Sequence, residues 1–224
     1  VSVSSTVTVP TGTEKIIDLG GHKITVDTVG DMFRAENSSL YLMNGTVEGG
    51  VSSSNFVCSV TGSDVTVDNV TITGIYGGIN VRDSGNEKTS SVHISNSKIT
   101  AGTAPVLVFG NGDESEGKTV LTIDSSELVS SEYIAIAGNG LTQYSETDIR
   151  IKDSKISGYW AGIFQPQQNS SLTIENSEVS GFTAIGIKGG SVKINDSKII
   201  GKDTTGGKYS PQAPAFSNSG FTDT

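Results

Sequence analysis

Residues 171–181 read SLTIENSEVSG, and residues 191–201 repeat the pattern as SVKINDSKIIG. In each stretch, apolar and polar residues alternate, an Asn or Asp followed by Ser interrupts them, and the alternation then resumes. A two-residue alternation is typical of a strand with one buried face, and Asn, Asp and Ser favour tight turns. Each stretch therefore predicts two short strands joined by a sharp polar corner.

The same pattern recurs along most of the chain. Its second apolar residue serves as a marker, and the markers are Leu42, Val67, Ile94, Ile123, Ile151, Ile174 and Ile194. Successive markers lie 20 to 29 residues apart, and we expect Leu19 to mark an earlier coil. Periods of this length indicate one supersecondary unit per repeat, and the dense leucines of leucine-rich repeats are missing.

A third strand is expected in each unit, at 79–81, 106–108, 134–136, 163–164 and 185–187. Strands that recur once per unit pair in parallel, and their inward residues stack into one core. The sequence thus predicts an all-β fold, a right-handed parallel β-helix of about eight coils. We assign residues 15–201 to this helix, 1–14 to an N-terminal cap or edge strand, and 202–224 to an irregular tail or an incomplete last coil.

Three polar columns are predicted at the corner after each marker. The first holds a residue that tolerates positive φ and could form a hydrogen-bonded ladder, namely Asn44, Asn69, Asn96, Ser125, Asp153, Asn176 and Asp196. A serine that usually follows is interpreted as a packed turn residue. The next position alternates in charge, which favours ion pairs between coils: Lys98, Glu127, Lys155, Glu178 and Lys198.

Composition and charge narrow the possible partners. Only 34% of the residues are hydrophobic and 6% aromatic, which suits a thin solenoid. The net charge of −9 argues against nucleic acid, whose phosphates require clusters of Lys and Arg. No apolar run approaches the ~20 residues that span a bilayer, and no signal peptide is present. The chain starts at Val1 without an initiator Met, so it is interpreted as an excised or processed piece. The single cysteine, Cys58, excludes an internal disulfide and is expected in the core.

The coil pattern and its Asn/Asp corner resemble the pectin-lyase-like superfamily of right-handed β-helices, over residues 15 to 201. Residues 17–24, IDLGGHKI, are similar to the opening coil of large bacterial surface and secreted β-helix proteins. The superfamily includes polysaccharide lyases, glycoside hydrolases, phage tailspikes and adhesins, so the fold alone assigns no reaction. The resemblance implies an extracellular or cell-surface location, with the signal peptide and anchor outside this chain.

Candidate catalytic residues lie on the outward face of the first strands. Glycosidases place two carboxylates on either side of the scissile bond. Asp68 and Asp124 lie two coils apart, ~9.6 Å if coils stack regularly, and His93 lies between them on a neighbouring column. Asp68, His93 and Asp124 form the best catalytic candidate; the alternative is a solvated polar face.

An acidic loop after a third strand is a candidate metal site. Asp113, Glu114 and Glu116 could supply oxygen ligands to calcium, but their segment lacks EF-hand spacing. A soluble acidic loop is the alternative, and no other cofactor is expected.

Aromatic side chains are candidates for sugar binding. Tyr76, Tyr133, Tyr159, Trp160 and Phe164 precede or lie in third strands and could stack on sugar rings; alternatively, they fill a wide corner of the coil. The outward columns of the third strands are expected to be Asn80, Leu107, Ala135, Phe164, Gly186 and, beside it, Arg82, Phe109, Ala137, Gln165, Lys188. The apolar part of these columns is either covered by loops or faces a partner.

Two functions remain open from the sequence. The leading hypothesis is a non-enzymatic extracellular β-helix module of a bacterial surface or secreted protein, an adhesive surface or stalk that binds a glycan or a host or cell-surface protein. The alternative is a carbohydrate-active enzyme, a lyase or glycoside hydrolase. The sequence names neither the ligand nor the oligomeric state.

Overall fold

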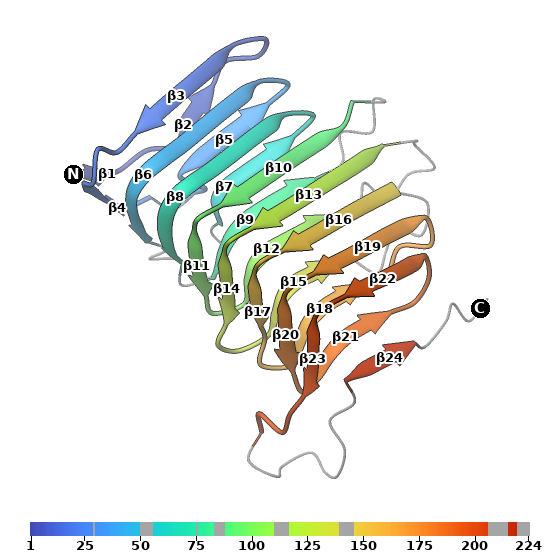
Figure 1. Ribbon diagram of the computed structural model, residues 1–224. Helices are drawn as coiled ribbons and strands as arrows, with labels where there is room; N and C mark the ends of the chain where they lie inside the picture. Colours follow the sequence, from blue (N-terminus) through green and yellow to red (C-terminus); the bar gives the residue numbers. More distant parts are fainter. Residues whose placement is uncertain are drawn as a thin grey trace.

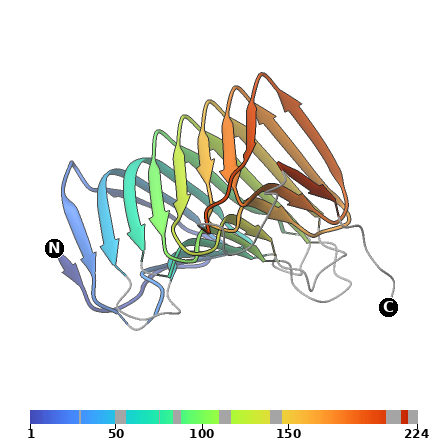
Figure 2. The same ribbon diagram turned by 90° about the horizontal axis from the view of Figure 1, so that it is seen from below.

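The protein is a β-solenoid whose strands all pair in parallel (Figure 1). The computed structural model describes residues 1–28, 30–49, 56–74, 76–82, 88–109, 117–138, 146–205 and 215–218. Seen from below, the coils follow one another in sequence order from the N-terminus to the C-terminus (Figure 2). The predicted all-β architecture is therefore confirmed.

One sheet of 15 strands bends along its length and forms two faces of the solenoid. The strands of its first face are β3 (Glu14–Asp18), β6 (Ser39–Gly49), β8 (Asp64–Gly74), β10 (Ser90–Ser95), β13 (Lys118–Asp124), β16 (Glu146–Lys152), β19 (Ser170–Glu175) and β22 (Ser191–Asn195). After the corner, β6 and β8 continue into the second face, which also holds β1 (Ser2–Val3), β4 (Lys23–Val26), β11 (Lys98–Ala101), β14 (Glu127–Ser130), β17 (Lys155–Ser157), β20 (Glu178–Gly181) and β23 (Lys198–Gly201).

A second sheet of nine strands closes the coil from behind. Its strands, in order, are β2 (Val7–Val9), β5 (Phe33–Glu36), β7 (Phe56–Thr61), β9 (Gly77–Arg82), β12 (Ala104–Phe109), β15 (Ile134–Gly138), β18 (Ala161–Gln165), β21 (Thr183–Ile187) and β24 (Phe216–Asn218). Residues on both sides of 15–201 thus add strands to the solenoid, because β1 and β2 pair with β4 and β5, and β24 pairs with β21.

The marker residues form one column, as predicted from their spacing. Register joins Leu42 to Val67 and continues through each later marker to Ile194. The prediction for the preceding coil was wrong, because Ile17 rather than Leu19 pairs with Leu42. Leu19 is buried beyond the strand end, against Gly45, where the glycine pair 20–21 adopts positive φ and extends the turn.

Third-strand register differs from the predicted alignment. Val106 pairs with Ile136, so Ala137 and not Ala135 follows Leu107 in the outward column. Ala135 is fully buried, and Gln165, expected on the outside, pairs with Ile187 and is 1% exposed. The segments between sheets vary in length and alanine fits either face, so spacing alone does not fix this register.

The corner residues have the expected backbone conformation. All seven have φ between 44° and 57°, and Asn37 adopts the same conformation at another corner. The predicted side-chain ladder forms in part: Asn69 Nδ2 donates to Asn44 Oδ1 at 3.1 Å, and Asn176 Nδ2 donates to Asp153 Oδ1. Asn96 instead donates to Asp68 Oδ1 at 2.9 Å.

The serines that follow the corners form a continuous backbone-linked column. The N–H groups of Val70, Ser97, Ser126, Ser154 and Ser177 each donate to the Oγ of a serine in the next coil at 3.0 Å. Each serine hydroxyl in turn donates to the backbone carbonyl two residues earlier in its own coil, at 2.6 to 2.7 Å. Each serine therefore accepts a hydrogen bond from a backbone N–H of the neighbouring corner, which fits the interpretation of these serines as packed turn residues.

The charged column also lies in register. Lys98, Glu127, Lys155, Glu178 and Lys198 pair in succession along the second face. Ion pairs form between Lys98 and Glu127 at 2.8 Å and between Lys155 and Glu178 at 3.7 Å. All four side chains are at least one third exposed, so each pair contributes at most ~1 kcal/mol.

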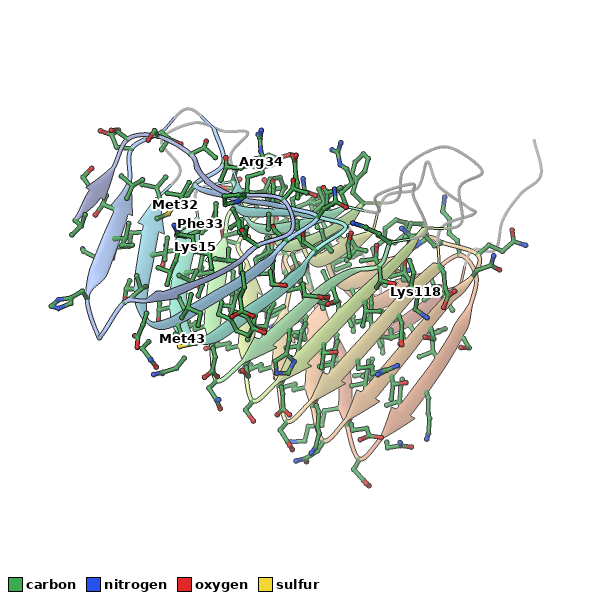
Figure 3. The ribbon with its side chains drawn as sticks, turned by 90° about the horizontal axis from the view of Figure 1, so that it is seen from above. Lys15, Met32, Phe33, Arg34, Met43 and Lys118 are labelled. Atoms are coloured by element: carbon green, nitrogen blue, oxygen red, sulfur yellow. The ribbon has the colours of Figure 1, made fainter. Side chains whose placement is uncertain are left out.

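The core lies between the two sheets and runs the length of the solenoid. It is filled by the inward residues of each coil, with Met32 and Phe33 among the largest fully buried side chains. Figure 3 shows Arg34 and Met43 on opposite outer faces, on either side of this layer. Cys58 belongs to the core, and burial raises its pKa to about 12, so it remains a neutral thiol.

We predict that Ser126→Ala destabilises the fold by about 1–3 kcal/mol, because it leaves the buried Ser97 N–H without an acceptor. Urea unfolding measures this as a lower midpoint with an unchanged slope. Ser131→Ala, at an exposed serine five residues on, is the matched control and should change stability by less than ~0.5 kcal/mol. Equal effects of the two substitutions would contradict the role of the serine column.

Candidate functional site

A groove of about 1040 Å³ runs along the solenoid at the corner between the two faces of the bent sheet. We call it the axial groove. It extends from Gly21 in an early coil to Lys198 near the C-terminal end of the solenoid. Its polar lining consists of corner residues and of residues two positions after them, namely Asn44, Thr46, Asn69, Thr71, Asn96, Lys98, Ser125, Glu127, Asp153, Lys155, Asn176, Glu178 and Asp196. Every coil between these limits contributes to it, so the groove is as long as the run of corners.

The left-handed corner places its side chains in this groove. A residue with positive φ bends the chain from the first face to the second without a longer loop, so its side chain stands at the outer edge of the corner. Asn69, Asn96, Asp153 and Asn176 are exposed there, while the residues that follow them, Val70, Ser97, Ser154 and Ser177, are buried. The groove floor is thus a row of amide, carboxylate and hydroxyl groups repeated at the inter-strand spacing of ~4.8 Å.

The charges of the groove nearly cancel. Lys98, Lys155 and Lys198 oppose Glu127, Asp153, Glu178 and Asp196. Lys98 forms an ion pair with Glu127, and Lys155 forms one with Glu178. Outside the groove lining, Lys152 Nζ lies 3.7 Å from Asp153 Oδ2. The groove therefore presents many hydrogen-bonding groups and carries almost no net charge.

The predicted catalytic residues all lie on the first face of the bent sheet. Asp68 and Asp124 each pair with Ser95, so they lie two strands apart in one column, and His93 lies on the next column between Thr66 and Thr122. Asp68 Oδ1 accepts hydrogen bonds from Ser95 Oγ at 2.6 Å and Asn96 Nδ2 at 2.9 Å. These bonds hold the pKa of Asp68 below its ordinary value, so Asp68 stays ionised and is unsuited to donate a proton.

The predicted aromatic residues separate into two groups. Tyr76 packs edge-to-face on Phe56 at 5.3 Å between ring centroids. Trp160 packs edge-to-face on Tyr159 at 5.3 Å and on Phe182 at 6.0 Å. Trp160 and Phe164 also contact a small apolar cluster of Ala104, Ile134, Ala137 and Ala161. Tyr133 lies in the coil next to Trp160 and is 47% exposed.

No metal centre is found in the described ranges, where no three His, Cys, Asp or Glu side chains gather closely enough to share an ion. The calcium candidates Asp113, Glu114 and Glu116 lie outside the described residues.

The sequence pattern predicts the polar residues that line the groove, but it does not predict the groove itself. From the sequence, each lining column is interpreted as structural, either in the turn or in ion pairing. The available signal was that two adjacent polar columns repeat in every coil, which implies a continuous polar channel once the corner between them is concave.

Comparison with known proteins leaves this site without a relative to guide its interpretation. Neither protein-family models, curated proteins nor solved structures give a match to the chain. The described part of the chain has no helix that is long and apolar enough to cross a membrane.

We predict that Asp68→Asn costs more stability at pH 7 than at about pH 2. The folded-state pKa of Asp68 is below the unfolded value, so its contribution is present above the unfolded pKa and is lost as the pH falls through the folded pKa. Urea unfolding of the wild type and the variant at both pH values measures the difference.

Asp27→Asn is the control, because Asp27 is exposed and makes no side-chain hydrogen bond among the described residues. It should change the free energy of unfolding by less than ~0.5 kcal/mol at either pH. A destabilisation by Asp68→Asn that is the same at both pH values would show that Ser95 and Asn96 do not favour the charged carboxylate.

Proposed function

We propose that this protein is a non-enzymatic glycan-binding β-helix module that holds an extended, largely uncharged polysaccharide in the axial groove. The observation that carries the proposal is a groove whose hydrogen-bonding groups recur once per coil along the whole run of corners. A linear polymer of hydroxyl-rich units matches such a surface, because each unit along the groove meets a similar set of donors and acceptors.

The chemistry of the groove supports a glycan over other polymers. Its near-neutral charge gives no attraction for nucleic acid or another polyanion. Its lining holds no exposed large apolar side chain that could anchor a peptide, since Val70 is 1% exposed. Neutral hydroxyl groups suit the mixture of amide, hydroxyl, carboxylate and ammonium groups.

Binding without turnover is favoured by the state of the carboxylates. Hydrolysis of a glycosidic bond needs a protonated carboxyl group beside a second carboxylate. Glu127 and Glu178 are held by lysines, and the pKa of Asp68 is lowered. Asp68 therefore favours its charged form, and the two glutamates are already engaged by lysine side chains.

The biological setting is part of the same proposal. The repeat resembles pectin-lyase-like right-handed β-helices of bacterial surface and secreted proteins, and this resemblance alone supports an extracellular location and an adhesive or stalk role. A rigid solenoid with a binding groove along its side is suited to both roles, because it extends from a surface while it contacts a polymer.

We predict that the double variant Asn96→Gly/Asn176→Gly binds a linear neutral glycan at least about fivefold more weakly than the wild type. Glycine keeps the left-handed corner, while two side chains with a net hydrogen-bond contribution of about 0.5–1.5 kcal/mol each are removed from the groove. A glycan array would identify the ligand, and titration calorimetry with that oligosaccharide would measure the affinities.

Asn37→Gly is the matched control, since Asn37 has the same left-handed backbone but lies at a corner outside the groove. It should bind like the wild type. An array without any bound linear glycan would overturn the proposal. Binding lost in Trp160→Ala but kept in the groove variant would move the site to the aromatic cluster, and shortening of the bound oligosaccharide on incubation would favour the enzyme.

A further inference from the structure

A second hollow, of about 320 Å³, lies on a different part of the molecule from the axial groove. It is formed on the outer face of the second sheet by strands β5, β7 and β9, and its charged and polar lining includes Asp31, Arg34, Glu36, Ser59, Asn80 and Arg82. We call it the arginine pocket. Its volume is at the lower end of the range for small-ligand sites.

Strand register fixes the shape of the pocket. Arg34 pairs with Ser59, and Ser59 pairs with Asn80, so these three form one outward column. Glu36, Thr61 and Arg82 form the next column. The two arginines therefore stand at diagonal corners, with the hydroxyl groups of the middle strand between them.

The floor of the pocket contains a hydrogen-bond acceptor that the described residues leave without a donor. Asn80 Oδ1 is buried and accepts no hydrogen bond from the described part of the chain. Ser59 Oγ donates its hydrogen to Asp31 Oδ2 at 2.6 Å, so towards a ligand it is an acceptor too. Asp31 Oδ1 accepts from Phe56 N at 3.0 Å, which fixes this carboxylate in place. A ligand with hydroxyl groups would supply the donors that Asn80 and Ser59 lack.

The rim of the pocket carries cationic donors. Arg34 and Arg82 are two of the three arginines in a chain of net charge −9. The Arg82 guanidinium lies over the Phe109 ring, 4.8 Å from its centroid, and forms no ion pair with a carboxylate of the described residues. Arg34 Nε is 4.0 Å from Glu36 Oε1, the limit for an ion pair, and both side chains are about half exposed. Guanidinium groups present paired N–H donors that match a carboxylate.

We propose that the arginine pocket binds a small hydroxylated carboxylate, such as an acidic monosaccharide. The carboxylate binds between the guanidinium groups, and the hydroxyl groups donate to Asn80 and Ser59. Asp31 and Glu36 disfavour a multiply charged anion such as phosphate, because they add negative charge at the same site. This site is independent of the glycan proposed for the axial groove.

The test is a titration of the protein with sodium glucuronate, followed by amide chemical shifts in NMR spectra. We expect saturable shifts centred on residues 77–82, with much weaker effects from glucose, which lacks the carboxylate, and from acetate, which lacks the hydroxyl groups. Arg82→Gln should weaken glucuronate binding at least tenfold. Inorganic phosphate should bind more weakly than glucuronate.

Arg150→Gln is the matched control, because Arg150 is an exposed arginine on the first face and pairs with Asp148. It should bind glucuronate like the wild type, and the unchanged amide spectrum of each variant away from its substitution would establish that it is folded. Absence of saturable shifts, equal binding of glucose, or equal weakening by Arg150→Gln would overturn the proposal. None of these results depends on whether a polysaccharide binds the axial groove.

Discussion

The structure depends on one interaction repeated at the corners of the later coils, where a left-handed residue is followed by a serine that the coil covers. The left-handed residue turns the chain within a single position, and Asn or Asp does so at low cost. The turn takes backbone N–H groups out of the ladder, and the serine of the next coil accepts their hydrogen bonds at 3.0 Å. The backbone N–H groups of the corner therefore find their acceptors only when consecutive coils lie directly above one another.

This corner explains how coils of unequal length remain in register. A slip of one residue would move every inward side chain to the outside, and the serine column prevents it at a fixed distance from each marker. The segments between the second sheet and the next first strand absorb the difference, since β9 ends at Arg82 and β10 begins at Ser90, whereas β21 ends at Ile187 and β22 begins at Ser191. The length of a coil therefore varies only in segments that contribute no residue to the stacked columns.

The limits of sequence reasoning follow from the same physics. The marker column, the left-handed corners and the charge pairs were predictable, because each is repeated at a fixed offset from the corner. Leu19 was misassigned because a glycine pair lengthens its turn, and Ala135 and Gln165 were misplaced because the distance to the third strand varies from coil to coil. The axial groove was missed because concavity depends on the angle between two faces, which no single repeat encodes. Arg34 and Arg82 come together only through the register of β5, β7 and β9.

Regular stacking also determines where a specific ligand can be recognised. Columns that hold a polar side chain in every coil, such as those of the axial groove, offer hydrogen-bonding groups at regular intervals and suit a polymer of similar units. A compact ligand instead requires a place where the columns change. Along the outer face of the second sheet, the column that begins with Arg34, Ser59 and Asn80 becomes Leu107, Ala137 and Phe164. The inward residues must repeat in every coil to keep the coils stacked, whereas the outward residues of this face can differ from coil to coil. The polar residues of β5, β7 and β9 therefore form a pocket that the repeat pattern alone does not provide.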